Sequence, residues 1–269
     1  MSATLAPTLA PASTQEQVIY PSLAGKRIVI TGGATGIGAA MVTAFAQQGA
    51  QVFFLDLADT EGLALAASLA DSPQVPNFLH CDLTDLAALA AVLESIIERI
   101  GAVDILINNA ANDDRHAISD VSPGYWDERM AVNLRHQFFC AQAVAPGMQR
   151  MGGGVILNLG SISWHLALPN LTLYMTAKAA IEGLTRGLAR ELGGHGIRVN
   201  TIIPGAVRTA RQMRLWHSPE DEVKILAAQC LPQRVEAEDI AALALFLASD
   251  SAAKCSARDY FVDAGWYGA

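Results

Sequence analysis

The chain of 269 residues carries 18 basic and 26 acidic side chains, which gives a net charge of −8. This length suffices for one sizeable core, and α/β domains of this size commonly stay single. The acidic balance and the lack of a run rich in Lys and Arg argue against nucleic acid and anionic membranes as partners, because both attract positive charge. Gly, Pro or charge interrupts every long apolar run, so the sequence predicts no membrane-spanning segment.

Residues 1–24 are rich in Ala, Pro, Ser and Thr, and Glu16 is their only charged side chain. We expect a flexible extension rather than a secretory signal, because Pro7 and Pro11 interrupt the only apolar candidate and no basic region precedes it. The cysteines are widely spaced and form no C-x-x-C pair, which predicts buried thiols in a reducing cytoplasm, without disulfides or a metal site. They are Cys81, Cys140, Cys230 and Cys255.

From residue 25 onward, apolar runs typical of strands alternate with helical stretches. This rhythm predicts a single α/β domain over residues 25–269, with a doubly wound parallel sheet flanked by helices. Sites in such sheets lie at the carboxyl ends of the strands, where Asp56, Asp82, Asn109, Ser161 and Pro204 fall. The predicted strands cover residues 26–31, 51–56, 77–81, 103–108, 154–159, 197–203 and 259–262.

A glycine-rich segment, Thr31-Gly32-Gly33-Ala34-Thr35-Gly36-Ile37-Gly38, connects the first strand to a helix predicted over residues 39–48. Its glycines allow a tight turn and a close approach to a pyrophosphate, whose charge would face the helix N-terminus. A tight strand-to-helix connection without a ligand is the alternative. Asp56 ends the second strand, where a carboxylate can bind the ribose hydroxyls of adenosine.

Tyr174 and Lys178 stand four residues apart, after Ser161. On a helix they would share one face, so an ammonium could stabilise a phenolate beside it. A tyrosine pKa of about 10 would need about 4 kcal/mol of preferential phenolate stabilisation to reach about 7, which lysine and an oxidised nicotinamide could jointly supply. Such pairs are common on helices, so the companion motifs decide that this one is a catalytic base.

Together these motifs resemble the short-chain dehydrogenase/reductase family over residues 25–265. The resemblance implies a Rossmann-like single domain, an NAD or NADP cofactor, a homotetramer and a catalytic set of Asn133, Ser161, Tyr174 and Lys178. One departure is Ala111, where the family usually has glycine, and its methyl group is expected to reshape the turn beside the nicotinamide slightly. The matching residues are Thr31–Gly38, Asn108-Asn109-Ala110, Asn133, Ser161, Tyr174, Lys178 and Pro204-Gly205.

The same resemblance assigns cofactor binding to residues near the strand ends. Asp82 would accept from the adenine amino group; the alternative is that its segment caps a helix through Thr84 or Asp85, and both can hold together. NAD is expected over NADP, because Leu57 follows Asp56 in place of an arginine; Arg27 is a basic side chain that could weaken this preference. The full predicted cofactor set is Gly32, Thr35, Gly36, Ile37, Gly38, Asp56, Asp82, Leu83, Asn109, Ala110, Tyr174, Lys178, Pro204, Gly205, Val207 and Thr209.

Asn133 is expected to bend its helix and to hold a water that links Lys178 to solvent. The alternative is an ordinary buried, hydrogen-bonded Asn. The stretch from Arg208 to Pro219 is interpreted either as a lid over the site or as a solvated helix face.

A narrower likeness is to bacterial aldose 1-dehydrogenases acting on pentoses, of the D-xylose and L-arabinose type. It lies in residues 112–116, 133–136, 160–165 and 264–266. It implies NAD-dependent oxidation of the anomeric hydroxyl of a small-molecule sugar to an aldonolactone. Open alternatives are another sugar such as L-fucose or D-galactose, a 3-oxoacyl or steroid reductase, and a nucleotide-sensing binding protein. The expected sugar contacts are Asn112, Asp113, Arg115, Ser161, Trp164, His165 and Tyr174.

Overall fold

The computed structural model describes residues 18–268. Across these residues the chain forms a 7-stranded parallel sheet in the order β3-β2-β1-β4-β5-β6-β7. The predicted doubly wound α/β fold is therefore confirmed. The strands are β1 (Arg27–Thr31), β2 (Gln51–Asp56), β3 (Asn77–His80), β4 (Ile105–Asn108), β5 (Gly154–Leu159), β6 (Ile197–Pro204) and β7 (Asp259–Val262).

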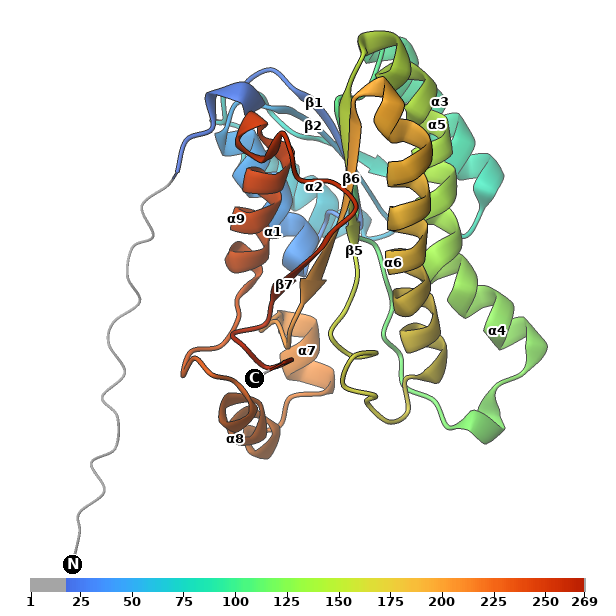
Figure 1. The fold of residues 1–269 in the computed structure, drawn as a ribbon, viewed down its shortest axis with the longest axis vertical. Coiled ribbons are helices and arrows are strands. Elements are labelled where there is room, and N and C mark those ends of the chain that lie inside the picture. Colours follow the sequence, from blue (N-terminus) through green and yellow to red (C-terminus); the bar gives the residue numbers. More distant parts are fainter. Residues whose placement is uncertain (1–17, 269) are drawn as a thin grey trace, which may run out of the picture.

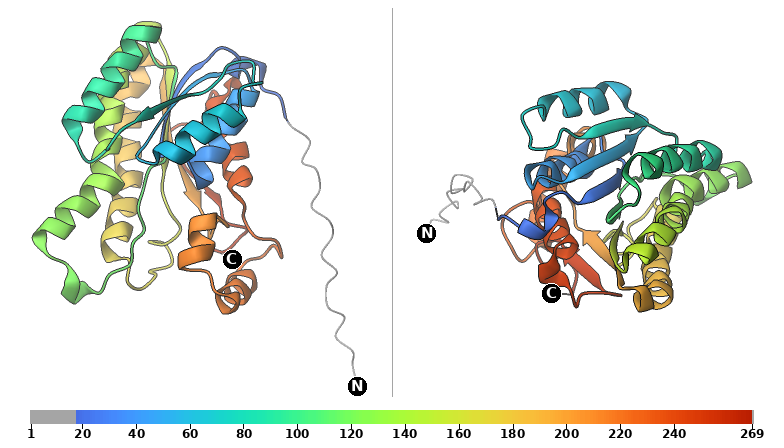
Figure 2. Two further views of the ribbon diagram at one scale, coloured as in Figure 1. Left: turned by 180° about the vertical axis from the view of Figure 1, so that it is seen from behind. Right: turned by 90° about the horizontal axis from the view of Figure 1, so that it is seen from above.

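Helices cover both faces of this sheet (Figure 1). Helices α1, α2 and α9 lie on one face, and α3, α5 and α6 lie on the other (Figure 2). A π-helical turn at Ala131–Arg135 joins α4 to α5. The helices are α1 (Gly36–Gln47), α2 (Asp59–Ser68), α3 (Leu86–Ile100), α4 (Pro123–Met130), α5 (His136–Met151), α6 (Thr172–Leu192), α7 (Ala210–Leu215), α8 (Pro219–Ala228) and α9 (Ala237–Ala248).

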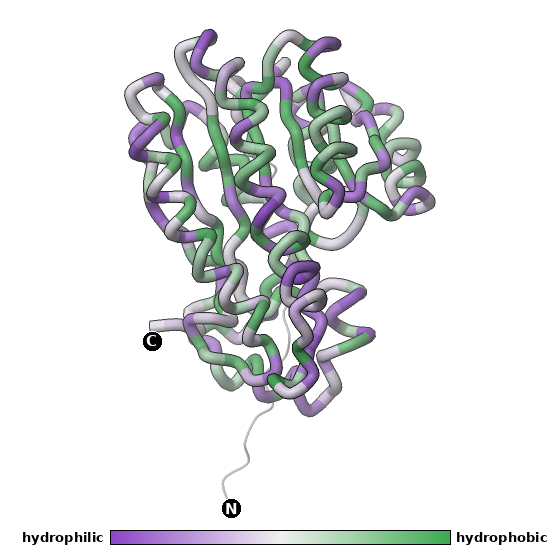
Figure 3. Tube along the Cα trace, turned by 90° about the vertical axis from the view of Figure 1, so that its right-hand side faces the viewer, coloured by the Kyte–Doolittle hydropathy of each residue, from purple (hydrophilic) through white to green (hydrophobic). Residues whose placement is uncertain are grey.

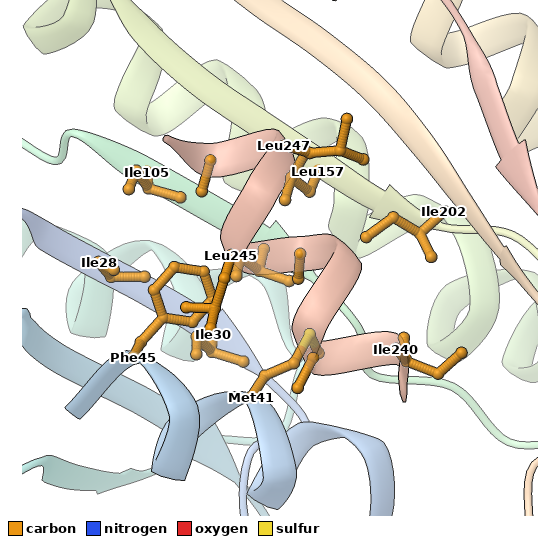
Figure 4. Close-up of a cluster of buried hydrophobic side chains, with 14 of the residues drawn as sticks. Ile28, Ile30, Met41, Phe45, Ile105, Leu157, Ile202, Ile240, Leu245 and Leu247 are labelled. Atoms are coloured by element: carbon orange, nitrogen blue, oxygen red, sulfur yellow. The ribbon is translucent and has the colours of Figure 1, made fainter. Parts of the chain in front are cut away.

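The strands read as continuous apolar runs because both faces of the sheet are buried. In β1, Ile28 and Ile30 face the cluster under α1 and α9, whereas Val29 faces the cluster under α3 and α5. Figure 4 shows the first cluster, in which Phe45 of α1 lies beside Leu245 of α9. Burying one such side chain fully stabilises the fold by about 1.5–3 kcal/mol, so the two clusters hold the strands in register.

The segment before β1 packs more tightly than the sequence predicts. Leu23 is fully buried, and the Tyr20 backbone N–H donates to Gln48 Oε1 at 2.8 Å. Gln48 Nε2 in turn donates to the Val18 carbonyl at 2.9 Å, and Ser22 Oγ accepts from the Asp250 N–H at 3.1 Å. The prediction of a flexible extension up to residue 24 is therefore wrong for residues 20–24, while residues 1–17 lie outside the described part.

Hydrophilic and hydrophobic residues alternate along the helices (Figure 3). Within residues 18–268 no helix combines the length and apolar character needed to cross a membrane. All the cysteines are free, and Cys81 and Cys140 are buried as predicted. Cys230 is exposed, so the prediction of buried thiols is wrong for that residue.

The strand order reverses between β1 and β4, and this reversal positions the site. From β1 the chain runs outward to β2 and β3, then crosses to β4 on the other side of β1. The loops after β1 and β4 therefore diverge, which leaves a crevice at the carboxyl ends of the strands. Helices α7 and α8 lie at this end, at the bottom of Figure 1.

Candidate active site

Three glycines in the segment after β1, Gly32, Gly33 and Gly38, have no room for a side chain. A Cβ on Gly38 would lie 1.8 Å from the Gly32 carbonyl oxygen, and one on Gly32 would lie 2.7 Å from the Ala110 Cα. Gly32 and Gly36 have φ of +64° and +55°, which glycine adopts without strain. Thr35 precedes α1 without a side-chain capping bond, and the first turn of α1 holds no acidic residue. The free backbone N–H groups at the start of α1 can therefore bind an anion, and the loop fits the pyrophosphate of a dinucleotide.

Asn109 fastens this loop to the end of β4. Its Nδ2 donates to the carbonyl oxygens of Thr31 at 3.0 Å and Gly32 at 2.8 Å. The buried Thr31 hydroxyl accepts from the backbone N–H groups of Asn109 at 3.0 Å and Ala110 at 3.2 Å. Ala111 is exposed and has no positive φ, so its methyl group is accommodated without left-handed strain.

Two acidic residues stand where an adenosine moiety is expected. The Asp56 oxygens accept from the Ala34 N–H at 2.9 Å and the Ala58 N–H at 3.1 Å, which fixes the carboxylate at the end of β2. Asp82 Oδ1 accepts from the Thr84 N–H at 2.8 Å and the Thr84 hydroxyl at 2.7 Å. The predicted helix cap is Asp85, which accepts from two N–H groups at the start of α3.

The loop after β6 completes the predicted cofactor side. β6 ends at Pro204, and a Cβ on Gly205 would lie 2.7 Å from the Asp263 Cα. Thr209 caps α7 by accepting from the Gln212 N–H, and its methyl group would lie 3.3 Å from a Cβ on Gly36. The β6 loop and the glycine loop therefore approach each other. Val207 pairs with Val235 in an isolated bridge that holds this loop.

Ser161, Tyr174 and Lys178 come together as the sequence predicts. Ser161 follows β5, and its hydroxyl donates to the Ser163 hydroxyl at 2.9 Å, while hydrogen bonding with Ser161 lowers the pKa of Tyr174. The buried Lys178 Nζ donates to the Leu159 carbonyl at 2.7 Å and lies 5.4 Å from the centre of the Tyr174 ring. Because Lys178 is anchored to the end of β5, its charge stays beside the phenol.

Burial dominates the ionisation of this pair. It raises the pKa of the Tyr174 phenol above its usual range; the charge of Asp113 raises it further, and the Ser161 hydrogen bond lowers it. Burial lowers the pKa of Lys178 to about 7, against an upward effect of Asp113. The protein groups alone therefore keep Tyr174 protonated at neutral pH. A tyrosinate base would need the positive charge of an oxidised nicotinamide in addition to Lys178.

Asn133 lies in the π-helical turn, so the helix is irregular where the sequence predicts a bend. Its Nδ2 donates to the Arg129 carbonyl at 3.0 Å, and its Oδ1 accepts from the Asn112 N–H at 2.8 Å. The fully buried side chain therefore positions the loop after β4. The predicted water path to Lys178 stays a prediction.

The predicted sugar contacts fall into two groups. Asn112, Asp113 and Arg115 lie on the loop after β4 and face α7, where Gln212 Nε2 donates to Asp113 Oδ2 at 2.7 Å. Arg115 is exposed and stacks over the Trp216 ring at 4.8 Å. The stretch interpreted as a lid thus contains α7 and packs against this loop.

Trp164 and His165 have different partners from those predicted. Glu182 Oε1 accepts from Trp164 Nε1 at 2.7 Å and pairs with His165 Nε2 at 2.9 Å. The ring centres of Trp164 and His165 lie 3.9 Å apart with their planes tilted by 35°, and His165 contacts Tyr267 near the C-terminus. Their polar atoms are therefore committed to α6, and contact with a sugar stays a prediction.

Several polar residues behind the site were assigned no role from the sequence, although Asn108 and His136 lie in segments that the resemblance includes. Asn108 Nδ2 donates to Asn158 Oδ1 at 2.9 Å, and Asn158 Nδ2 donates to the Thr185 hydroxyl at 2.9 Å, all within the core. His136 is fully buried beside Lys178, and its Nε2 lies 3.2 Å from the Ala110 carbonyl oxygen. Polar residues inside apolar runs were the available signal for the two asparagines.

Comparisons with known proteins agree with this geometry. The family model described as enoyl-(acyl carrier protein) reductase matches residues 32–267. A D-xylose 1-dehydrogenase of Caulobacter vibrioides is 58% identical over 92% of this chain and 98% of its own. The chain belongs to the short-chain dehydrogenase/reductase family. A probable galactose dehydrogenase, GalD, of Rhizobium meliloti is 46% identical over 91% of this chain and 96% of its own.

Solved structures of this family include nicotinamide complexes. A 7 alpha-hydroxysteroid dehydrogenase with NADH and 7-oxo glycochenodeoxycholic acid has a TM-score of 0.87 and 32% identity, and the match covers 93% of this chain and 97% of that one. A blue fluorescent protein from a metagenomic library, with NADPH, has a TM-score of 0.84 and 32% identity, covering 91% and 99%. The family thus binds nicotinamide cofactors of both kinds.

Proposed function

We propose that this protein oxidises a cyclic aldose at C1 to the aldonolactone, with D-xylose as the first candidate and L-arabinose as a second pentose. The central observation is the Ser161–Tyr174–Lys178 set, which lies beside a loop that fits a dinucleotide. The 58% identity to a D-xylose 1-dehydrogenase, over nearly the full length of both chains, supports D-xylose as the candidate substrate.

Each residue of the set has a defined role in the proposed reaction. Ser161 aligns the anomeric hydroxyl by a hydrogen bond, and Tyr174 removes its proton as the general base. Lys178, fixed by the Leu159 carbonyl, stabilises the phenolate and binds ribose hydroxyls of the cofactor. A bound oxidised nicotinamide supplies the hydride acceptor and a positive charge near the phenol. Because the proton leaves the oxygen and the hydride leaves C1, the reaction needs no covalent intermediate.

Asp56 supports NAD as the preferred cofactor. Its carboxylate is fixed at the end of β2, where a 2′-phosphate of NADP would bring about −1.5 to −2 charges. Two unit charges at 4 Å repel by about 1 kcal/mol in water and about 4 kcal/mol at an effective dielectric of 20, so NADP should be disfavoured roughly ten- to a thousandfold. Arg27 does not offset this charge, because it pairs with Asp104 before the start of β4.

A panel of sugars tests the proposed function. NADH absorbance is followed with D-xylose, L-arabinose, D-galactose and L-fucose, and Tyr174→Phe serves as the inactive control. Higher kcat/KM with a pentose supports the proposal. D-galactose is the second candidate, because a probable galactose dehydrogenase is 46% identical. Turnover only with a steroid or an acyl substrate, or NAD binding without any turnover, would contradict it.

We propose further that the protein works as a cytoplasmic homo-oligomer, a tetramer by family resemblance. Phe138 of α5, Phe261 of β7 and Tyr267 expose 42%, 38% and 47% of their surface, which supports burial between subunits. The free thiols of Cys81, Cys140, Cys230 and Cys255 fit a reducing compartment. Sedimentation at low and high protein concentration tests the assembly, and a monomer at both would overturn it.

A further inference from the structure

The loop after β4 is held rigidly on both sides of Asp113. The Asn112 N–H donates to Asn133 Oδ1 at 2.8 Å. The His116 N–H donates to the Asn170 carbonyl at 3.0 Å, and the His116 ring accepts from the Leu173 N–H at 3.3 Å. Asp113 therefore lies between two hydrogen-bonded positions of this loop, Asn112 and His116.

Helix α7 holds that side chain. Gln212 Nε2 donates to Asp113 Oδ2 at 2.7 Å, and Arg211 lies 3.5 Å from Asp113 Oδ1 and 2.7 Å from Asp114 Oδ1. The Asp113 side chain is only 17% exposed, whereas that of Arg211 is 42% exposed. The Gln212 hydrogen bond is thus the shorter and better shielded of the two links to Asp113.

The loop that carries Asp113 is tied to the start of α6, because the His116 ring accepts from the N–H of Leu173, the residue before Tyr174. From this loop the Asp113 charge raises the pKa of both Tyr174 and Lys178. The titratable and charged groups around this site are Tyr174 and Lys178 on α6, Arg211 on α7, His136 on α5, Arg129 on α4, and Asp114, Arg115 and His116 on the loop itself.

We propose that Gln212, assisted by Arg211, is a positioning residue that holds Asp113 as a partly compensated negative charge near Tyr174 and Lys178. This inference rests on the proposed function and extends it. The contact of Asp113 with the sugar stays a prediction, and the role proposed here is a link between α7 and the base. The placement of α7 therefore sets how readily the base loses its proton.

The signs follow from electrostatics. A negative charge near Tyr174 opposes the phenolate, and near Lys178 it favours the ammonium. Asp113→Asn removes the charge but keeps an oxygen that can accept from Gln212, so both pKa values should fall. Gln212→Leu removes the compensating donor at similar volume without changing net charge, so both pKa values should rise. A purely structural role would not produce opposite shifts from the two partners of one hydrogen bond.

The first readout is independent of turnover. The lysines are Lys26, Lys178, Lys224 and Lys254, so ¹³C labelling at the lysine ε-carbon gives few NMR signals, and Lys178→Met assigns the relevant one. The Lys178 pKa, at about 7 in the native protein, should fall by about one pH unit in Asp113→Asn and rise by about half a unit in Gln212→Leu. Arg214→Gln is the matched control on α7, because Arg214 is exposed and its side chain makes no hydrogen bond or ion pair within residues 18–268.

The second readout is the pH at which kcat/KM for sugar oxidation falls on the acid side of its pH profile. This pH should decrease in Asp113→Asn and increase in Gln212→Leu, as the two pKa values do. In the double variant, Gln212→Leu should add no further shift, because Gln212 acts through Asp113. The proposal would be overturned if neither variant changes the pKa of Lys178. It would also be overturned if Gln212→Leu shifts that pKa equally in the native background and in the Asp113→Asn background. If the native enzyme oxidises no sugar, the proposed function is wrong. The titration of Lys178 would still test this inference, because it does not depend on turnover.

Discussion

Gly38→Ala tests whether the glycine loop is a cofactor cradle or merely a connection. The added Cβ would lie 1.8 Å from the Gly32 carbonyl oxygen and 2.8 Å from Asn109 Nδ2, the group that already binds that oxygen. Since real contacts stay above 3.0 Å, the loop and the start of α1 must separate by more than about 1 Å. Overpacking of this kind costs about 1–3 kcal/mol of stability. A misplacement of about 1 Å can cost about a hundredfold in rate.

The assay combines steady-state kinetics with NAD titration by fluorescence. Gly38→Ala should lower kcat/KM for NAD at least about a hundredfold and weaken NAD binding. Gly183→Ala is the matched control: Gly183 lies within α6, and its added Cβ would meet nothing within 4 Å. That variant should gain about 0.5–1 kcal/mol of stability from helix propensity, with kinetics unchanged. If Gly38→Ala binds NAD with native affinity, the glycine loop is not the site that holds the cofactor pyrophosphate.

Three further predictions follow from the same site. Tyr174→Phe keeps the ring but removes the ionisable oxygen, so kcat should fall at least about a hundredfold while NAD still binds; near-normal turnover would exclude Tyr174 as the base. Asp56→Ala should shrink the ratio of kcat/KM with NAD to that with NADP, and an unchanged ratio would show that Asp56 does not set cofactor choice. Burial, then the charge of Lys178, lowers the pKa of His136 from 6.5 to about 4. A neutral native His136 stabilises the fold fully above about pH 6.5, and this contribution, about 3 kcal/mol, is lost as pH falls towards 4. Urea unfolding at pH 7 and pH 4.5 should therefore show a smaller acid loss in His136→Gln than in the native protein, and equal losses would contradict the buried neutral imidazole.

The strands and the catalytic pair were predictable because local sequence determines them. Strands buried on both faces leave continuous apolar runs, such as Ile28 to Ile30, that few other structures produce. Tyr174 and Lys178 share a helix face by spacing alone. Asp85 caps α3, as one of the two alternatives for that segment predicts.

The contacts that connect distant segments were not predictable. Glu182 meets Trp164 and His165 only because the loop after β5 folds back along α6, which no local pattern encodes. Gln212 and Asp113 are far apart in sequence and meet across the crevice. Leu23 lies in a segment of loop-like composition, yet it is completely buried. Burial lowers the Lys178 pKa, and the local sequence pattern does not show how deeply that side chain is buried.

Hydride transfer from C1 of the sugar is the central claim, and deuterium labelling tests it most directly. The native enzyme is incubated with NAD and D-xylose deuterated at C1, or with another aldose so labelled if the panel favours it. The mass of the reduced cofactor is then measured by mass spectrometry. The account predicts one deuterium in the reduced nicotinamide and the aldonolactone, or the acid formed from it, as the product. Reduced cofactor without deuterium, formed while the sugar is consumed, would contradict it.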